Sequence, residues 1–100
     1  MAMRILLCAC AMVLAFQVHA ADKSVVDRYN KTCVVCHSSG AAGAPKFGAA
    51  QDWAPRLAKG QEKLLVSIKN GLNAMPPKGM CNDCSDTEYK ALIQYMSTGK

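Results

Sequence analysis

Residues 33–37 read Cys33-Val34-Val35-Cys36-His37, and the interpretation of the whole chain starts from this stretch. Two thiols three positions apart can each add to one vinyl group of a haem, and the next residue then presents its imidazole to the iron. His37 is the only histidine after residue 20, and it stands in the position that this chemistry requires. The motif therefore predicts one haem c, attached covalently through Cys33 and Cys36, with His37 as an iron ligand.

The first twenty residues have the composition of an export signal. They contain 17 hydrophobic residues, a cation at Arg4 and an unbroken apolar run over residues 5–16. A signal-peptide core has about 7–15 apolar residues, whereas a membrane-spanning helix needs about 20. Small residues before the predicted cleavage point at Ala20 place a signal peptide over residues 1–20 and the mature domain over residues 21–100. We expect export to the periplasm; an uncleaved anchor and a lipoprotein site at Leu7-Cys8-Ala9-Cys10 are the alternatives.

Composition limits the class of protein. The 100 residues carry a formal charge of +5, and beyond residue 20 the hydrophobic share is 34 of 80 residues with a formal charge of +4. These values exclude a multidomain enzyme, a polytopic membrane protein and a disordered acidic tail. Only thirteen of those 80 residues are Val, Leu, Ile or Phe, a share below the ~20% at which a chain folds on its own side chains. A small domain of this kind needs a staple, so we expect something other than side chains to fill its centre.

Hydrophobic spacing and capping signals predict three main helices and no strand. The first helix is expected over residues 24–36 and the second over residues 61–70. The third begins at the capping box Ser85-Asp86-Thr87-Glu88, which is followed by apolar residues at helical spacing. A short helical turn is expected over residues 49–58, where Pro55 limits its length. Because no run of period two occurs, the predicted fold class is all-α.

The iron needs a sixth ligand from another part of the chain. Once His19 is removed with the signal peptide, no second histidine remains, which leaves methionine, lysine, water or nothing. Met96 lies on the apolar stripe of the last helix and is interpreted as core, and Met80 is interpreted as a surface or packing residue. Met75 begins the sequence Met75-Pro76-Pro77, in which two prolines stiffen the backbone and hold the side chain out. Met75 is therefore the favoured ligand, and Met80 is second.

Four motifs resemble those of the class I c-type cytochromes in the order of that family: Cys33-x-x-Cys36-His37, Gly43-Ala44-Pro45, Trp53-x-x-Arg56 and Met75-Pro76-Pro77. With Cys81-Asn-Asp-Cys84 before the last helix, the chain is most similar to cytochrome c5, a bacterial monohaem branch. The resemblance spans residues 22–99 and implies a small helical fold wrapped around one haem, with the first and last helices crossed. It implies His37 and Met75 as axial ligands and the Pro45 carbonyl as the group that orients His37. Trp53 and Arg56 are expected near the haem propionates.

The second cysteine pair, Cys81 and Cys84, has three interpretations. A zinc site shared with Cys33 and Cys36 would have 44 residues between its two halves, whereas such sites usually have about 15–20. A catalytic dithiol of the thioredoxin type accompanies a βαβ pattern, and the sequence has no such pattern. A structural Cys81–Cys84 disulfide is the preferred interpretation, and it would tie the loop after Met75 to the start of the last helix.

Iron held by His37 and Met75 has no open position, so we expect one-electron exchange and a soluble electron carrier of a bacterial respiratory chain, not an enzyme. Lys31, Lys46 and Lys78 are expected around the haem edge, where they would steer redox partners with acidic docking surfaces. Such partners include an oxidase, a reductase or a membrane cytochrome complex, which would place the protein at the membrane periphery. The scattered basic residues argue against nucleic acid. The alternatives are a haem-based small-ligand sensor or peroxidase-like enzyme with a labile Met75, and a haem-free zinc or thiol module.

Overall fold

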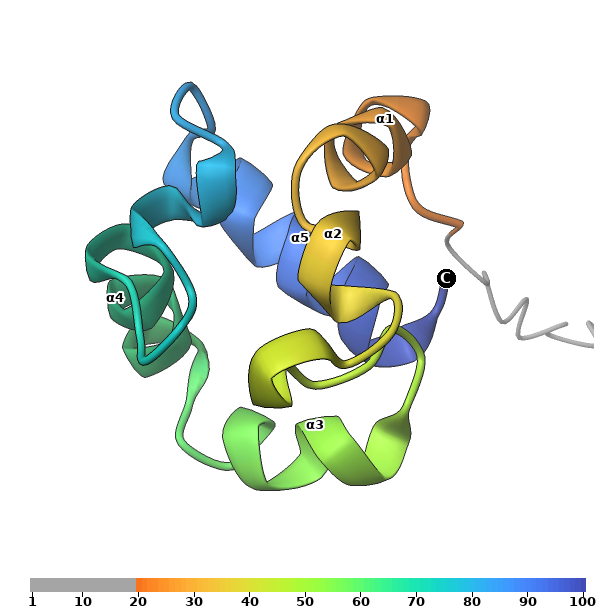
Figure 1. The fold of residues 1–100 in the computed structure, drawn as a ribbon. Helices are drawn as coiled ribbons and strands as arrows, with labels where there is room; N and C mark the ends of the chain where they lie inside the picture. The colour runs from red at the N-terminus through yellow and green to blue at the C-terminus, as the bar shows by residue number, and fades with distance from the viewer. Residues whose placement is uncertain (1–19) are drawn as a thin grey trace, which may run out of the picture.

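The computed structural model describes residues 20–100, so the predicted signal peptide lies outside the described residues apart from Ala20. Within residues 20–100 the chain forms five α-helices and two 3-10 helices and no strand (Figure 1). In chain order these are α1 (Lys23–Lys31), α2 (Val34–His37), η1 (Ala41–Gly43), α3 (Ala50–Leu57), α4 (Gln61–Asn70), η2 (Pro77–Met80) and α5 (Asp86–Thr98). The predicted all-α class is confirmed.

The longest helix, α5, begins where the sequence places its capping box. The Ser85 hydroxyl accepts a hydrogen bond from the Glu88 amide at 3.2 Å, and the Glu88 carboxylate accepts one from the Ser85 amide at 3.3 Å. These two bonds satisfy donors that the first turn of a helix leaves unpaired. The apolar residues at helical spacing are all buried: Tyr89, Leu92, Ile93 and Met96. α5 therefore presents one apolar face to the core.

Helix α4 also has the predicted bounds, with Leu65 and Ile68 buried. It ends at Gly71, whose φ is 84°, and a Cβ at this position would lie 2.9 Å from the carbonyl oxygen of Met75. Only glycine tolerates both this backbone conformation and this close approach. The chain can therefore turn directly from α4 into the segment that carries Met75.

The helix predicted over residues 24–36 is instead two helices, α1 and α2, and that prediction is wrong at this point. Thr32 interrupts the helix with φ −132° and ψ −75°, and its hydroxyl donates to the Arg28 carbonyl oxygen at 2.7 Å. A threonine hydroxyl competes in this way with the regular hydrogen bonds of a helix. Because of the break, α2 takes its own direction and carries Cys36 and His37 as a separate element (Figure 1).

The core lies where the first and last helices meet. α1 packs against α5 and α2, and α5 also contacts α3 and α4 (Figure 1). Ten apolar residues form the buried cluster: Val25, Tyr29, Trp53, Leu65, Ile68, Cys81, Tyr89, Leu92, Ile93 and Met96. Only five of the thirteen Val, Leu, Ile and Phe residues belong to it, which agrees with a fold that depends on a bound group. Among residues 20–100, no helix is long and apolar enough to cross a membrane.

Candidate haem site

A cleft runs between α2 and η1 on one side and the segment from α4 into η2 on the other. It encloses about 770 Å³ of space free of atoms, counting the part that is open to solvent. Six of the residues predicted to bind haem line it: Cys33, Cys36, His37, Pro45, Arg56 and Met75. Most of the remaining wall is apolar or small: Val35, Ala41, Ala42, Gly43, Ala44, Leu72, Ala74, Pro76 and Gly79. An apolar cleft with two thiols, an imidazole and a thioether is a donor set that suits a porphyrin and its iron.

His37 is held in one orientation by the loop that follows it. Its side chain is buried, and its Nδ1 lies 2.8 Å from the carbonyl oxygen of Pro45. Because a carbonyl only accepts hydrogen bonds, Nδ1 carries the proton and Nε2 has the free lone pair. The main chain adds a second link, since the Phe47 amide donates to the His37 carbonyl oxygen at 2.7 Å. The tautomer and ring orientation that an iron ligand needs are therefore set by the protein.

Trp53 lies beside the His37 ring and not on the cleft wall. The two ring centroids are 5.7 Å apart with their planes at 22°, and the indole N–H donates to the Lys46 carbonyl oxygen at 2.8 Å. An indole has one donor, and this bond uses it, whereas the family resemblance implies a place for Trp53 near the haem propionates. Arg56 does line the cleft. Its Nη1 donates to the Asp52 carbonyl oxygen at 2.7 Å, and its Nη2 makes a long 3.4 Å bond to the Gly43 carbonyl oxygen. Its guanidinium keeps donors for a carboxylate.

Met75 lies on the other wall, in a loop closed by its own main chain. Its amide donates to the Leu72 carbonyl oxygen at 2.9 Å, and its carbonyl oxygen accepts from the Leu72 amide at 3.1 Å. A Cβ at Gly79 would lie 3.0 Å from Met75 Cε, so the thioether methyl fills the space that this glycine leaves. Met80 also lines the cleft but is 58% exposed, and Met96 is buried in the core. Of the three methionines, Met75 alone is both on the cleft wall and partly buried.

Left-handed backbone conformations gather around the cleft, a feature that the sequence analysis missed. Within residues 20–100, four residues other than glycine have positive φ: Ala42 at 54°, Asn73 at 53°, Lys78 at 65° and Met80 at 69°. Ala42, Asn73 and Met80 line the cleft. Each such residue costs about 1–2 kcal/mol. It persists only where the surrounding structure holds it, and strained backbone of this kind concentrates at functional sites. Only Asn73 is of a type that favours this conformation, so the sequence carries almost no signal for it.

The two cysteines of the motif are unpaired among residues 20–100. Cys33 and Cys36 are both partly buried, and both line the cleft. Burial raises the pKa of the Cys33 thiol above its usual value, and the Thr32 hydroxyl 3.3 Å from its sulfur acts in the opposite direction. Both sulfurs are thus available for thioether bonds to a group in the cleft.

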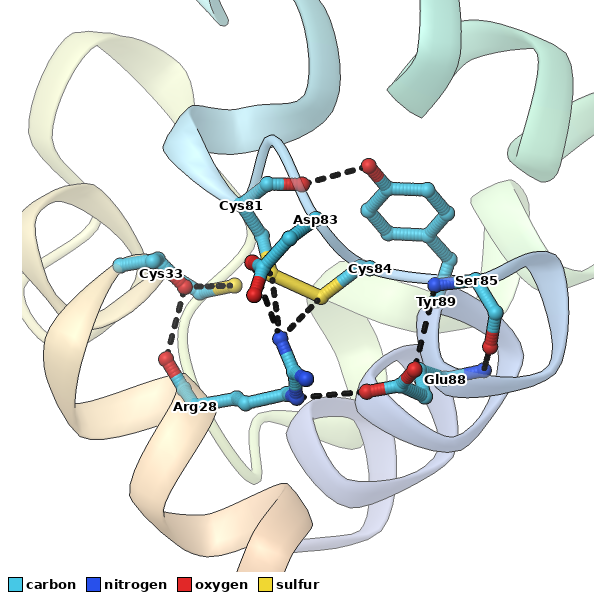
Figure 2. Close-up of polar contacts among 9 residues, drawn as sticks. Arg28, Cys33, Cys81, Asp83, Cys84, Ser85, Glu88 and Tyr89 are labelled. Atoms are coloured by element: carbon cyan, nitrogen blue, oxygen red, sulfur yellow. Dashed lines mark hydrogen bonds and ion pairs between the residues drawn. A yellow bond between two sulfur atoms is a disulfide. The ribbon is translucent and has the colours of Figure 1, made fainter.

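The remaining two cysteines of residues 20–100 form a disulfide, Cys81–Cys84, which removes their sulfurs as zinc ligands. Figure 2 shows the Arg28 guanidinium between this disulfide and the start of α5. Its Nη1 lies 3.5 Å from each sulfur and 3.1 Å from the Asp83 carboxylate, and its Nε pairs with Glu88. α1 is therefore tied to the segment that joins η2 to α5.

Comparison with known proteins places the chain in a family. Residues 20–96 match the family model described as cytochrome C oxidase, cbb3-type, subunit III. Cytochrome c5 from Ectopseudomonas mendocina is 44% identical over 77 residues, which are 75% of this chain and 88% of the relative. Cytochrome c5 from Azotobacter vinelandii is 52% identical over 69 residues, which are 67% of this chain and 83% of the relative. The chain belongs to the class I c-type cytochromes.

Solved structures agree with this cytochrome assignment. A mono-haem ferrocytochrome c from Shewanella putrefaciens is 57% identical with a TM-score of 0.68, and the match covers 81% of this chain and all of that one. A cytochrome c in an electron-transfer complex with nitrite reductase is 41% identical with a TM-score of 0.68, covering 78% of this chain and 95% of that one. The resemblance to cytochrome c5, the single covalent haem c and a role in electron transfer rather than catalysis are confirmed.

Proposed function

We propose that the protein is a soluble periplasmic electron carrier of a bacterial respiratory chain, with His37 and Met75 as the axial ligands of its haem. The observation that carries this proposal is the cleft itself. It collects the thiols of Cys33 and Cys36, a buried imidazole and a partly buried thioether from segments far apart in the sequence. The apolar run over residues 5–16 supports export.

The residues of the cleft would have different roles in holding the haem. Cys33 and Cys36 would anchor the haem through thioether bonds, and His37 Nε2 and Met75 Sδ would bind its iron. When bound, the haem supplies one-electron exchange between ferric and ferrous iron. The neutral thioether and the apolar wall would both disfavour the extra charge of the ferric form, so they would raise the reduction potential. If His37 and Met75 both held the iron, small ligands such as oxygen would be kept from it.

The rim of the cleft suits a protein partner. Among the described residues, three of the five most exposed large apolar side chains line it: Val35 (64% exposed), Leu72 (52%) and Met80 (58%). We call these three the apolar rim. Lys78 lies next to it in η2, and the chain has a positive net charge. An acidic redox partner would be steered by charge and then held by apolar contact, and the relative that forms a complex with nitrite reductase supports a reductase as one such partner.

Absorption spectroscopy of the exported protein tests the ligand assignment. The oxidised protein should show the weak band near the red end of the spectrum that reports an iron–sulfur bond to methionine. We expect Met75→Ala to abolish this band and to allow carbon monoxide to bind the reduced protein. Met80→Ala is the matched control, because Met80 lines the same cleft and is exposed. A band that survives in Met75→Ala, or a high-spin wild-type protein that binds carbon monoxide, would overturn the proposal in favour of a sensor or a peroxidase-like enzyme.

A further inference from the structure

We propose that Trp53 is a positioning residue for His37, and that it sets the reduction potential through the loop between them and not through a haem propionate. The inference rests on the proposed role of His37 as an axial ligand. It begins with two contacts: the indole lies against the imidazole with centroids 5.7 Å apart, and its N–H donates to the Lys46 carbonyl oxygen at 2.8 Å.

The Trp53 indole binds Lys46, the residue next to Pro45, whose carbonyl oxygen orients His37. Lys46 follows Pro45, whose carbonyl oxygen lies 2.8 Å from His37 Nδ1. α3 holds Lys46 at both ends, because Trp53 binds its carbonyl oxygen and the Asp52 carboxylate accepts from its amide at 3.1 Å. The peptide that carries the Pro45 carbonyl is the one whose N–H belongs to Lys46. Fixing Lys46 therefore fixes the direction of the acceptor that His37 uses.

This arrangement gives a definite electronic effect. A hydrogen bond from Nδ1 to a well-placed acceptor makes the imidazole a more basic ligand at Nε2. A more basic ligand stabilises the ferric form, which lowers the reduction potential. Loosening the Pro45 carbonyl by removing the Trp53 hydrogen bond should therefore raise the potential, and it should also expose the Nδ1 proton to exchange with solvent.

The test compares two variants of the haem-loaded protein. Trp53→Phe keeps a ring beside His37 but loses the hydrogen bond to Lys46. Tyr89→Phe is the matched control, because it removes a hydrogen bond of the same kind, from a buried aromatic side chain to the Cys81 carbonyl oxygen at 2.6 Å. The measurements are the potential as a function of pH and the exchange rate of the hyperfine-shifted His37 Nδ1 proton by NMR.

We expect Trp53→Phe to shift the equilibrium between ferric and ferrous iron toward the ferrous form by roughly threefold to tenfold. This effect is smaller than the ~10–100-fold loss of metal affinity or activity that follows when the group bonded directly to a metal-binding residue is removed. Exchange of the Nδ1 proton should accelerate by a similar factor. Tyr89→Phe should lower thermal stability and change neither quantity. Equal effects of the two variants would overturn the proposal. So would a pH-dependent shift in potential with unchanged proton exchange, because that result places the indole on a haem carboxylate.

If Trp53→Phe does not fold, Asp52→Ala tests the same loop from its other end. It removes the acceptor of the Lys46 amide, and we expect a smaller shift of potential and exchange rate in the same direction; no change would overturn the proposal. Failure of the proposed function is recognised separately. It appears in the wild-type protein, as a spectrum without low-spin character, before any variant is compared.

Discussion

Replacing Gly79 with alanine should displace the thioether of Met75, the proposed iron ligand, and lower the stability of the fold only moderately. Gly79 lies in η2 with φ 54°, and a Cβ there would be 3.0 Å from Met75 Cε. Carbon atoms in good contact are about 3.5–4.0 Å apart, so the new methyl group and the thioether methyl overlap by about 0.5–1 Å. The end of a methionine side chain moves more easily than backbone, so Met75 yields.

The cost has two parts. Alanine in the left-handed region costs about 1 kcal/mol, at the low end of the ~1–2 kcal/mol for an L-residue. Forcing Met75 away from its preferred rotamer adds about 0.5–1.5 kcal/mol. The sum is about 2 kcal/mol, which for a domain of this size lowers the melting temperature by roughly 8–16 °C. Because Cε is bonded to Sδ, the same displacement moves the sulfur, and the band that reports the iron–methionine bond should weaken or disappear.

Gly99→Ala provides a matched control. Gly99 also has a left-handed backbone, with φ 74°, but a Cβ there would meet its nearest neighbours at ordinary distances of 3.5 and 3.8 Å. It should therefore lose about 1 kcal/mol through the backbone alone and keep the red band. Thermal unfolding and the oxidised absorption spectrum are measured for both variants. If Gly79→Ala keeps the full band while losing no more stability than Gly99→Ala, the close approach of Gly79 to the Met75 thioether does not position the proposed ligand.

Three further outcomes are expected. The double variant Cys81→Ala and Cys84→Ala should lose about 2 kcal/mol in thermal unfolding, as expected for so short a loop, and keep a low-spin spectrum; a high-spin spectrum would contradict a purely structural disulfide. Burial, with smaller contributions from nearby carboxylates, raises the pKa of Tyr89. Below pH ~10, the usual tyrosine pKa, the neutral phenol of Tyr89 makes its full contribution to the free energy of unfolding. This contribution is lost as the pH rises through the higher folded-state pKa. Tyr89→Phe should therefore flatten the alkaline fall in stability followed by circular dichroism, whereas an unchanged slope would assign that fall to other groups. Val35→Ser should weaken binding to an acidic redox partner by about 1 kcal/mol at any salt concentration, whereas Lys78→Gln should slow association only at low salt. Stopped-flow measurements of electron transfer at two ionic strengths separate the two effects. An effect of Val35→Ser that depends on salt would contradict the proposed role of the apolar rim.

The parts of the fold that the sequence predicts well depend on local signals. α4 has the expected bounds and α5 begins at the expected residue, because a terminal glycine, a capping box and helical spacing all act within a few residues. The division of residues 24–36 was not predicted, because every residue there is compatible with a continuous helix. The break appears in the backbone angles of Thr32 and in the bond from its hydroxyl to the Arg28 carbonyl oxygen, and hydrophobic spacing reveals neither.

In the candidate site too, the sequence predicts the local features and does not predict those that the surrounding fold imposes. The cysteine–histidine motif lies in five consecutive residues, so the sequence alone identifies it. The sequence does not determine which acceptor the Trp53 indole N–H binds, and in the structure it donates to the Lys46 carbonyl oxygen. The left-handed conformations of Ala42, Lys78 and Met80 are imposed by the surrounding fold, since none of these residue types favours positive φ.

The two walls of the cleft are held in different ways. On the histidine side, the loop over residues 45–48 bonds to three helical elements: Phe47 to the His37 carbonyl in α2, Trp53 of α3 to the loop carbonyl, and Gly48 to the Met96 carbonyl in α5. On the methionine side, the bonds of Met75 run to Leu72 of the same loop.

Bonds to distant elements break only when those elements separate, whereas bonds within one loop break when that loop alone opens. Local opening costs less free energy than global unfolding, so we expect the Met75 side to open at a lower free energy than the His37 side. Substitutions at Gly79 and at Trp53 should therefore be detected by different measurements. A change at Gly79 acts on the loosely held wall and should appear as loss of the iron–sulfur bond. A change at Trp53 acts on a wall held from three directions, so His37 stays bound and the effect should appear in the potential and in exchange of its Nδ1 proton.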